Sequence, residues 1–353
     1  MSDKRGTAVL ASLSPRNISA VYLFVIMFVV FSFWVPDTFL TAGVWRSMLD
    51  TQSLTALAAI AVVVPLAAGV INLAVGAEIG FASIVVAALI RHSDLPPAAA
   101  VPLTIGVGAL VGVVSGLLVV GAKIDSLIAT LGMSSVLAAL TAWISGSQQI
   151  LELGAGFYNL ATRQFWGVTV TTWFTLAVAL VTWYVLQCTA LGRRVYATGG
   201  NRRAAQFAGV RTSAVIVAAF VACGAITALA GVLQSARTAT GDPTVGPGYL
   251  LPAYAAAMLG STQITRGRYN VWGAVVGVYV LATGIKGLQL AGAPLWIPDL
   301  FNGVALLAAV AVGARQRIKK VRTKTAAPAG HETNPPPSDT VVSSSVSGER
   351  TTV

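Results

Sequence analysis

Two polar side chains beside or within long apolar runs are the residues of this sequence best placed to do chemistry. Asn72 lies in a glycine-containing break at residues 68–76, and Glu78 is the only acidic residue firmly inside an apolar run. A carboxylate near the centre of a membrane helix costs about 2.5–3.5 kcal/mol. Either both residues line or gate a path through the membrane, or the break is a short cytoplasmic turn. In the second case Asn72 caps the next helix and Glu78 lies in its first turn, near the positive end of the helix dipole.

A second group of candidate path residues stands at the entry to a later apolar run. Residues 241–248 read Gly-Asp-Pro-Thr-Val-Gly-Pro-Gly and are followed by Tyr249. Glycine and proline at this density disfavour a regular helix, so we expect a partly unwound or re-entrant segment. Irregular backbone at membrane depth survives only against protein or a wet cavity. Gly246, Gly248 and Tyr249 therefore join Asn72 and Glu78 as candidates for a translocation path.

The third feature is a polar loop at residues 189–212, which is rich in arginine. Asn201 can cap a short helix that runs through Phe207, and Gly209 can end that helix. A loop that only carried positive charge would not need a capped helix with an exposed Phe207. We interpret this helix as a plug for a cleft on a cytoplasmic partner, in the manner of a helix in a groove.

Enzyme chemistry is not expected in this chain. The sequence has no phosphate-binding glycine loop, and its two histidines lie in the polar tail and, as His92, at the end of an apolar run. Cys188 and Cys223 stand in or beside apolar runs, with no spacing typical of a metal site or a disulfide framework. We therefore expect no catalytic residue, no metal and no cofactor here, and a separate chain must bind any ATP that is used.

The composition indicates that membrane-spanning elements position these residues. Of the 353 residues 56% are apolar and only 10% are charged, and the mean hydropathy is +0.77. A soluble domain carries about 25% charged residues, so an ordinary soluble enzyme is excluded. The net charge of +11 would suggest nucleic-acid binding in a soluble chain, but here the basic residues fall between apolar runs, as in cytoplasmic loops. We expect lipid around the chain and no nucleic acid.

The apolar runs predict an all-α polytopic membrane protein with about ten transmembrane helices, because a span needs about 20 mainly apolar residues. The runs are 18–35, 53–71, 74–91, 98–121, 126–145, 169–188, 213–236, 249–262, 270–289 and 296–314. Small residues at helical spacing, such as Gly108, Gly112 and Gly116, predict close helix packing. Lys286 is expected to be an interfacial anchor near the outer end of its span.

Basic residues predict the orientation. With the N-terminus inside, seventeen Lys and Arg residues of the loops and ends fall on the cytoplasmic side and five on the other. This bias favours an even number of spans with both termini in the cytoplasm. Residues 1–17 form a cytoplasmic segment, 18–314 the transmembrane domain, and 315–353 a tail that is first basic and then disordered, because it is rich in Pro, Ser and Thr.

The loop at 189–212 also carries the most specific similarity to a known family. Its pattern resembles the cytoplasmic signature of ribose-type, or simple sugar, ABC transporter permeases. The matching residues are Gly199-Gly200-Asn201, Ala204-Ala205 and Ala208-Gly209-Val210. Residues 124–133, and residues 243–249 with 259–262, are similar to two further segments of that family in order and spacing. The resemblance covers about residues 18–314.

The resemblance implies a permease subunit of the plasma (inner) membrane with ten spans. Such permeases work in pairs, identical or paralogous, with two ATPase subunits and an extracytoplasmic sugar-binding protein, and they import monosaccharides and related polyhydroxylated solutes. Residues 201–209 would be the coupling helix that docks into the ATPase, with the loop at 263–270 beside it. The implied coupling residues are Gly200, Asn201, Ala204, Ala205, Phe207 and Gly209.

Two departures from the family pattern leave the solute open. The family usually has an acidic residue in place of Asn72 and further acidic residues where this chain has residues 250–252, Leu-Leu-Pro. The alternative is an ion-coupled secondary transporter with broken helices near Asn72 and Gly246. Against that alternative, the chain has one plausible intramembrane carboxylate and no evident proton-relay chain. A scaffold without transport would not explain ten spans with several polar breaks.

Overall fold

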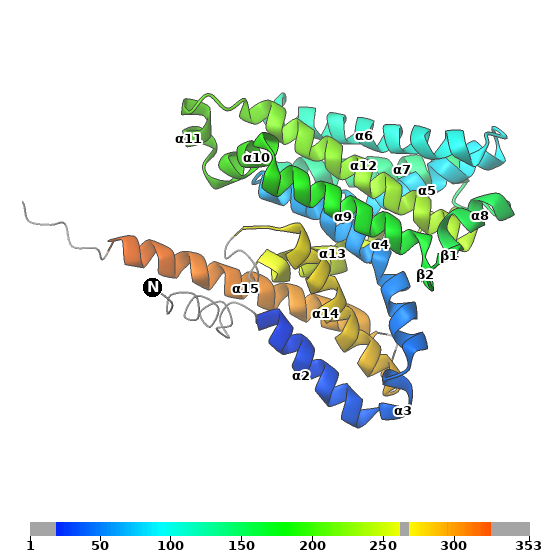
Figure 1. Cartoon of the computed structure of the whole chain (residues 1–353). Coiled ribbons are helices and arrows are strands. Elements are labelled where there is room, and N and C mark those ends of the chain that lie inside the picture. The colour runs from blue at the N-terminus through cyan, green and yellow to red at the C-terminus, as the bar shows by residue number, and fades with distance from the viewer. Residues whose placement is uncertain (1–18, 262–267, 295, 326–353) are drawn as a thin grey trace, which may run out of the picture. The chain divides into compact units, whose positions relative to one another are not determined.

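The computed structural model describes residues 19–261, 268–294 and 296–325, and this part is almost entirely helical (Figure 1). The helices are α2 (Ser19–Trp34), α3 (Pro36–Phe39), α4 (Ala42–Ala67), α5 (Val75–Arg91), α6 (Pro97–Val120), α7 (Ser126–Ser145), α8 (Ala155–Thr162), α9 (Val170–Cys188), α10 (Ala190–Gly200), α11 (Arg202–Phe207), α12 (Thr212–Thr238), α13 (Pro247–Ser261), α14 (Val271–Leu290) and α15 (Ile297–Thr325). Strands β1 (Gln164–Phe165) and β2 (Val168–Thr169) form an antiparallel hairpin, with Gln164 opposite Thr169. The prediction of an all-α fold is confirmed, apart from this hairpin.

The chain divides after Gly313 into two compact units, and the description below concerns the first. In the second unit the structure describes only the helical residues 314–325. The predicted N-terminal segment at 1–17 and the part of the tail that is predicted to be disordered, from about residue 325, lie outside the described residues. The basic part of the predicted tail is within the described residues.

Each predicted apolar run falls largely within one helix: α2, α4, α5, α6, α7, α9, α12, α13, α14 or α15. Among the described residues, six of these helices are long and apolar enough to cross a membrane: α4, α6, α7, α9, α12 and α14. Helices α2, α5 and α13 have 16, 17 and 15 residues, and the apolar part of α15 is also short. The chain is therefore a polytopic membrane protein, while the count of ten spans and the cytoplasmic termini stay predictions.

Helix α4 begins eleven residues before the predicted apolar run at 53–71. Its first turns contain polar residues, so the apolar pattern of the sequence did not include them. Arg46, Asp50 and Gln52 lie there. Its second part, from Ser53 to Ala67, is buried in the core between α12, α13, α14 and α9. A helix that is apolar on all sides belongs in such a position. Helix α4 therefore joins a polar outer part to the centre of the bundle.

Helices α6 and α12 run side by side and touch through glycines (Figure 1). A Cβ atom added at Gly108 would lie 2.4 Å from the carbonyl oxygen of Gly224, and one at Gly112 would lie 2.3 Å from that of Phe220. At Gly116 the nearest atom would be the Cα of Val217, at 2.9 Å. Small residues that allow such backbone contact associate helices in lipid, where the hydrophobic effect cannot. The close packing predicted from these glycines is confirmed.

The short elements lie at opposite ends of the long helices. Helices α10 and α11 stand together between the end of α9 and the start of α12, whereas α8 and the hairpin lie at the other end of these two helices (Figure 1). Phe157 and Ala161 of α8 are fully buried and anchor it to the bundle. The two ends therefore present different surfaces.

The contact between α6 and α12 predicts the effect of one added methyl group. Gly112→Ala should lower the apparent Tm of the purified protein in detergent, because overpacking costs about 1–3 kcal/mol. Gly106→Ala is the matched control on the same helix, since Gly106 is exposed and a Cβ there meets nothing within 4 Å. Alanine has the higher helix propensity, so the control should leave the Tm unchanged or raise it slightly. An equal Tm for the two variants would contradict the packing role.

Candidate functional site

The predicted cytoplasmic helix is present as α11, and its two ends have the expected chemistry. The side-chain oxygen of Asn201 accepts a hydrogen bond from the backbone N–H of Ala204 at 3.0 Å, which caps the first turn. Gly209 takes a φ of +79°, a left-handed conformation that favours glycine after a helix. The N–H of Val210 then bonds the carbonyl of Ala205 at 3.0 Å and closes the end. Both ends of this helix are therefore fixed by contacts among residues 201–210.

The predicted coupling residues are mostly on the outside of this element. Gly200, Asn201, Ala204, Phe207 and Gly209 are exposed, and the side chain of Phe207 is 92% exposed. Ala205 is the exception, because it is buried and faces the rest of the chain. Leaving a Phe ring in water is unfavourable, so this residue marks a surface that a partner can cover.

Behind this surface, α10 touches the turn that follows α4 through bare backbone. A Cβ atom at Gly199 would lie 2.2 Å from the carbonyl oxygen of Ala67, and one at Gly69 would lie 2.9 Å from the Cα of Gly199. Gly69 also has a φ of +81°, which only glycine adopts easily. Helix α10 and the turn after α4 are therefore in direct backbone contact, with no side chain between them.

Helix α10 is also tied to the segment before α14. The hydroxyl of Tyr196 donates a hydrogen bond to the carbonyl of Tyr269 at 2.7 Å, and the Arg268 guanidinium lies 5.7 Å from the centre of the Tyr196 ring. Burial raises the pKa of Tyr196, although the charge of Arg268 opposes this shift, so the hydroxyl stays a donor at neutral pH. Of the loop expected beside the coupling helix, residues 268–270 are described, and Arg268 and Tyr269 contact α10. Residues 263–267 lie outside the described residues.

The break between α4 and α5 is an irregular turn held by side chains of other helices. The N–H of Ile71 bonds the Ser126 hydroxyl of α7 at 3.3 Å, and that of Leu73 bonds the Thr130 hydroxyl at 3.0 Å. The Tyr254 hydroxyl of α13 accepts from the N–H of Asn72 at 3.1 Å and donates to its carbonyl at 2.7 Å. Buried peptide groups without such partners would each cost several kcal/mol in an apolar surrounding.

Asn72 and Glu78 form a closed polar cluster rather than an open lining. Asn72 is fully buried and Glu78 is 3% exposed. The Asn72 amide donates to one carboxylate oxygen of Glu78 at 3.0 Å, and the Thr227 hydroxyl donates to the other at 2.7 Å. The Asn72 side-chain oxygen accepts from the N–H of Ala74, but Ala74 itself is the N-cap of α5 and no side chain caps this helix. The predicted cap at Asn72 is therefore wrong, because this side chain stabilises the turn before the helix. Glu78 does lie in the first turn of α5, and a role in the path stays a prediction.

The candidate path residues Gly246, Gly248 and Tyr249, at the start of α13, have different surroundings. The backbone is not helical at 239–246, and Gly246 is buried against α5, where its Cβ would lie 2.2 Å from the carbonyl oxygen of Gly76. Gly248 is exposed and open. Tyr249 is half-buried, and its hydroxyl donates to the side-chain oxygen of Gln234 at 2.9 Å. The irregular backbone expected here is present, and it lies against protein.

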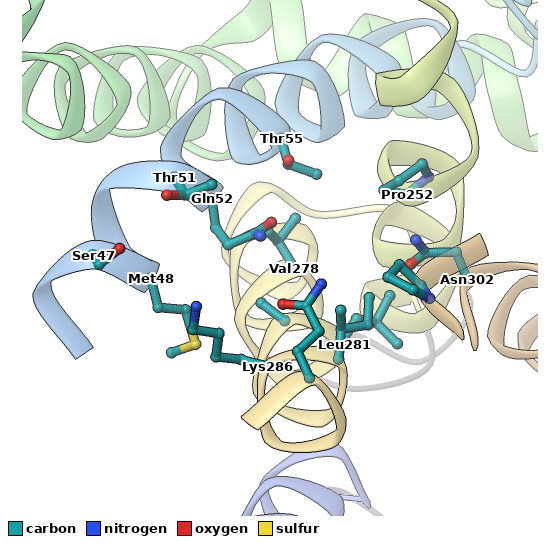
Figure 2. Close-up of a pocket in the computed structure, with 14 residues that line it drawn as sticks. Ser47, Met48, Thr51, Gln52, Thr55, Pro252, Val278, Leu281, Lys286 and Asn302 are labelled. Carbon is teal, nitrogen blue, oxygen red and sulfur yellow. The ribbon is translucent and has the colours of Figure 1, made fainter. Parts of the chain in front are cut away.

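A cavity of about 260 Å³ lies elsewhere, between α4, α13, α14 and α15 (Figure 2). Its wall is formed by Ser47, Met48, Thr51, Gln52, Thr55, Pro252, Val278, Leu281, Ala282, Ile285, Lys286, Gln289, Pro298 and Asn302. Lys286, which the sequence suggested as an interfacial anchor, is one of these residues. Sequence reasoning missed the cavity, although the spacing of Ser47, Thr51 and Thr55 places three hydroxyls on one helical face.

The cluster around Glu78 predicts the cost of removing one hydroxyl. Thr227→Val keeps the shape of the side chain but deprives a buried carboxylate oxygen of its donor, which costs about 1–3 kcal/mol. Thr104→Val is the matched control, because the buried Thr104 hydroxyl bonds only the carbonyl of Ala100 in its own helix. The apparent Tm in detergent should fall clearly further for Thr227→Val, and equal values would contradict the cluster as a stabilising contact.

Comparison with known proteins agrees with this architecture. The family described as "Branched-chain amino acid transport system / permease component" matches residues 46–310. The ribose import permease protein RbsC of Escherichia coli (strain K12) is 29% identical, over 80% of this chain and 89% of its own. No solved structure shows significant similarity to the chain.

Two further relatives have a sequence identity to this chain that is slightly higher than that of the Escherichia coli protein. The L-arabinose ABC transporter permease protein AraH of Azospirillum brasilense is 31% identical, over 82% of this chain and 85% of its own. The RbsC protein of Bacillus subtilis (strain 168) is 33% identical, over 69% and 76%. These relatives are permease components of ABC transporters and not ATPases. The chain therefore belongs to this permease family, and within it to the ribose-type sugar permeases of ABC transporters.

Proposed function

We propose that the chain forms the transmembrane path of an ABC importer for a monosaccharide or a related polyhydroxylated solute. The chain is a multi-pass protein of the plasma (inner) membrane. The observation that carries the proposal is the exposed, capped helix α11, which has Phe207 at its end. It directly follows α10, whose Gly199 contacts the backbone of the turn after α4. A helix built in this way suits a cleft on another protein.

The proposed partners follow from this surface and from the family. Two ATPase subunits bind ATP and receive α11, a second permease, identical or paralogous, completes the path, and an extracytoplasmic binding protein delivers the solute. ATP-driven closure of the ATPases moves α10 and α11, and Gly199 passes that movement to the turn after α4. This turn is held by α7 and α13, so a rearrangement there reaches helices on both sides of α4.

The proposed topology has ten spans with both ends in the cytoplasm. Residues 18–314 form the permease domain, with the coupling loop at 189–212, after a cytoplasmic segment at 1–17 and before a tail at 315–353. In this orientation α10 and α11 lie inside, and the cavity lies near the outer ends of α4 and α14. Candidate path residues are Asn72, Glu78, Gly246, Gly248 and Tyr249, of which the first two act by holding the turn.

A sugar is the solute that the similar proteins favour. Those reported above import ribose or arabinose according to their names, and the D-allose permease AlsC of Escherichia coli is 28% identical. The family description names branched-chain amino acids instead, so these are the competing solute class. The buried Glu78 has two hydrogen-bond donors from this chain, which suits a structural role better than a proton-carrying one. We therefore propose ATP as the energy source instead of an ion gradient.

The exposed ring of α11 gives the test of coupling. Phe207→Glu should abolish solute uptake and remove the ATPase from the purified complex, while the protein still inserts in the membrane, because the charge cannot enter an apolar cleft. Phe165→Glu is the matched control, since Phe165 is also exposed but lies at the opposite end of the bundle. Normal uptake and a normal amount of ATPase with Phe207→Glu would rule out α11 as the coupling helix.

Uptake by cells with and without the chain tests the solute class and the energy source. We expect uptake of labelled D-ribose, L-arabinose or D-allose, lost on ATP depletion and retained when an uncoupler collapses the proton gradient. L-leucine should not enter. Sugar uptake that an uncoupler abolishes at normal ATP would identify a secondary transporter instead, and uptake of leucine alone would assign the amino-acid class.

A further inference from the structure

We propose that the cavity between α4, α13, α14 and α15 is a binding site of the permease itself for a polyhydroxylated solute of monosaccharide size. This inference rests on the proposed function, because it gives the importer a second place of selection after its binding protein. Four features support it: the polar wall, an unpartnered amide, an unpaired lysine and the position of the cavity.

The residues that line the cavity include both hydrogen-bonding and apolar side chains. Figure 2 shows Gln52 of α4 and Asn302 of α15 on opposite sides of the space. Within the described residues, Gln52 has no hydrogen-bond partner, so its amide is free to donate to and accept from a solute. Pro252, Val278 and Leu281 add apolar surface. A few convergent polar groups on an apolar wall are typical of small-molecule sites.

Asn302 is the strongest single indication of a missing partner. Its side chain is buried, with only 6% of the residue exposed, and its carbonyl oxygen has no hydrogen-bond partner in the described part of the chain. Such an unpaired buried acceptor costs about 1–3 kcal/mol. Because Asn302 is one of the wall residues, a hydroxyl of a solute in the cavity would supply the missing donor for this oxygen.

Lys286 brings a positive charge to the cavity without an acidic partner. No ion pair joins it to the residues that the structure describes. Asp50 of α4, close in sequence to Thr51 of the wall, is already paired with Arg237 at 3.6 Å. The three donors of a lysine ammonium suit the ring and hydroxyl oxygens of a sugar.

The size and the position of the cavity fit a site that binds the solute soon after the binding protein releases it. Its volume of about 260 Å³ lies just below the usual range for small-molecule pockets, about 300–1,000 Å³, which suits a pentose or hexose better than a larger solute. Along α4 the wall residues end at Thr55, and the contact with α10 begins at Ala67. These are about 18 Å apart at 1.5 Å per residue. The cavity is thus remote from the coupling elements, on the side to which the predicted topology assigns the binding protein.

The test compares transport ratios in proteoliposomes that contain the complete importer with its ATPase and binding protein. Gln52→Leu and Asn302→Leu should change the relative rates for D-ribose, L-arabinose and D-allose by about threefold to tenfold, because each removes a contact that depends on the arrangement of hydroxyls. Gln187→Leu and Asn159→Leu, at exposed positions outside the cavity, should keep the wild-type ratios. A purely structural defect lowers all three rates by one factor.

Cysteine protection gives an independent measurement on the permease–ATPase complex without binding protein. In a Cys188→Ser background, D-ribose or the best transported sugar should slow the reaction of Thr51→Cys with a charged maleimide. The same sugar should not protect Gln148→Cys, which lies in an exposed loop. Unchanged transport ratios together with absent protection, in an importer that transports the sugar, would overturn the binding site and leave the proposed function standing. Failure of the wild type to import any of the sugars would instead overturn the proposed function.

Discussion

The structure depends on one requirement: the buried peptide groups of an irregular turn inside a helix bundle must have hydrogen-bond partners. The turn between α4 and α5 meets it with hydroxyls from Ser126 and Thr130 of α7 and from Tyr254 of α13. Because these partners lie on different helices, the turn fixes where those helices stand. Any change at the turn must therefore be accommodated by its neighbours, and the proposed mechanism places the conformational switch here.

Glycine contacts connect this turn to the outside of the protein. Gly199 of α10 lies against the carbonyl of Ala67 and the backbone of Gly69, so α10, which directly precedes the helix that carries Phe207, meets this turn through main chain. Side chains would cushion such a contact by changing rotamers, whereas packed backbone transmits displacement. The same kind of contact between α6 and α12 keeps the surrounding helices in register.

The proposed site and the proposed coupling surface use different parts of α4. Its polar first half lines the cavity with Thr51 and Gln52, and its apolar second half runs through the core to the turn at Gly69. One helix therefore joins both proposed functions. In the proposed importer, occupation of the cavity and movement of α11 would influence each other through this helix.

The sequence by itself determined the elements that local chemistry specifies. Apolar runs of sufficient length located the long helices, and the Asn201 cap with the glycine at 209 defined α11, since each depends on neighbours within a few residues. Only the tertiary structure decided which polar groups meet. The hydrogen bond between Glu78 and Thr227 connects residues 149 positions apart. The cavity is lined by residues of α4 together with Asn302 of α15, which are also far apart in the sequence. Such pairings follow from the packing of distant helices, and hydropathy along one chain carries no information about them.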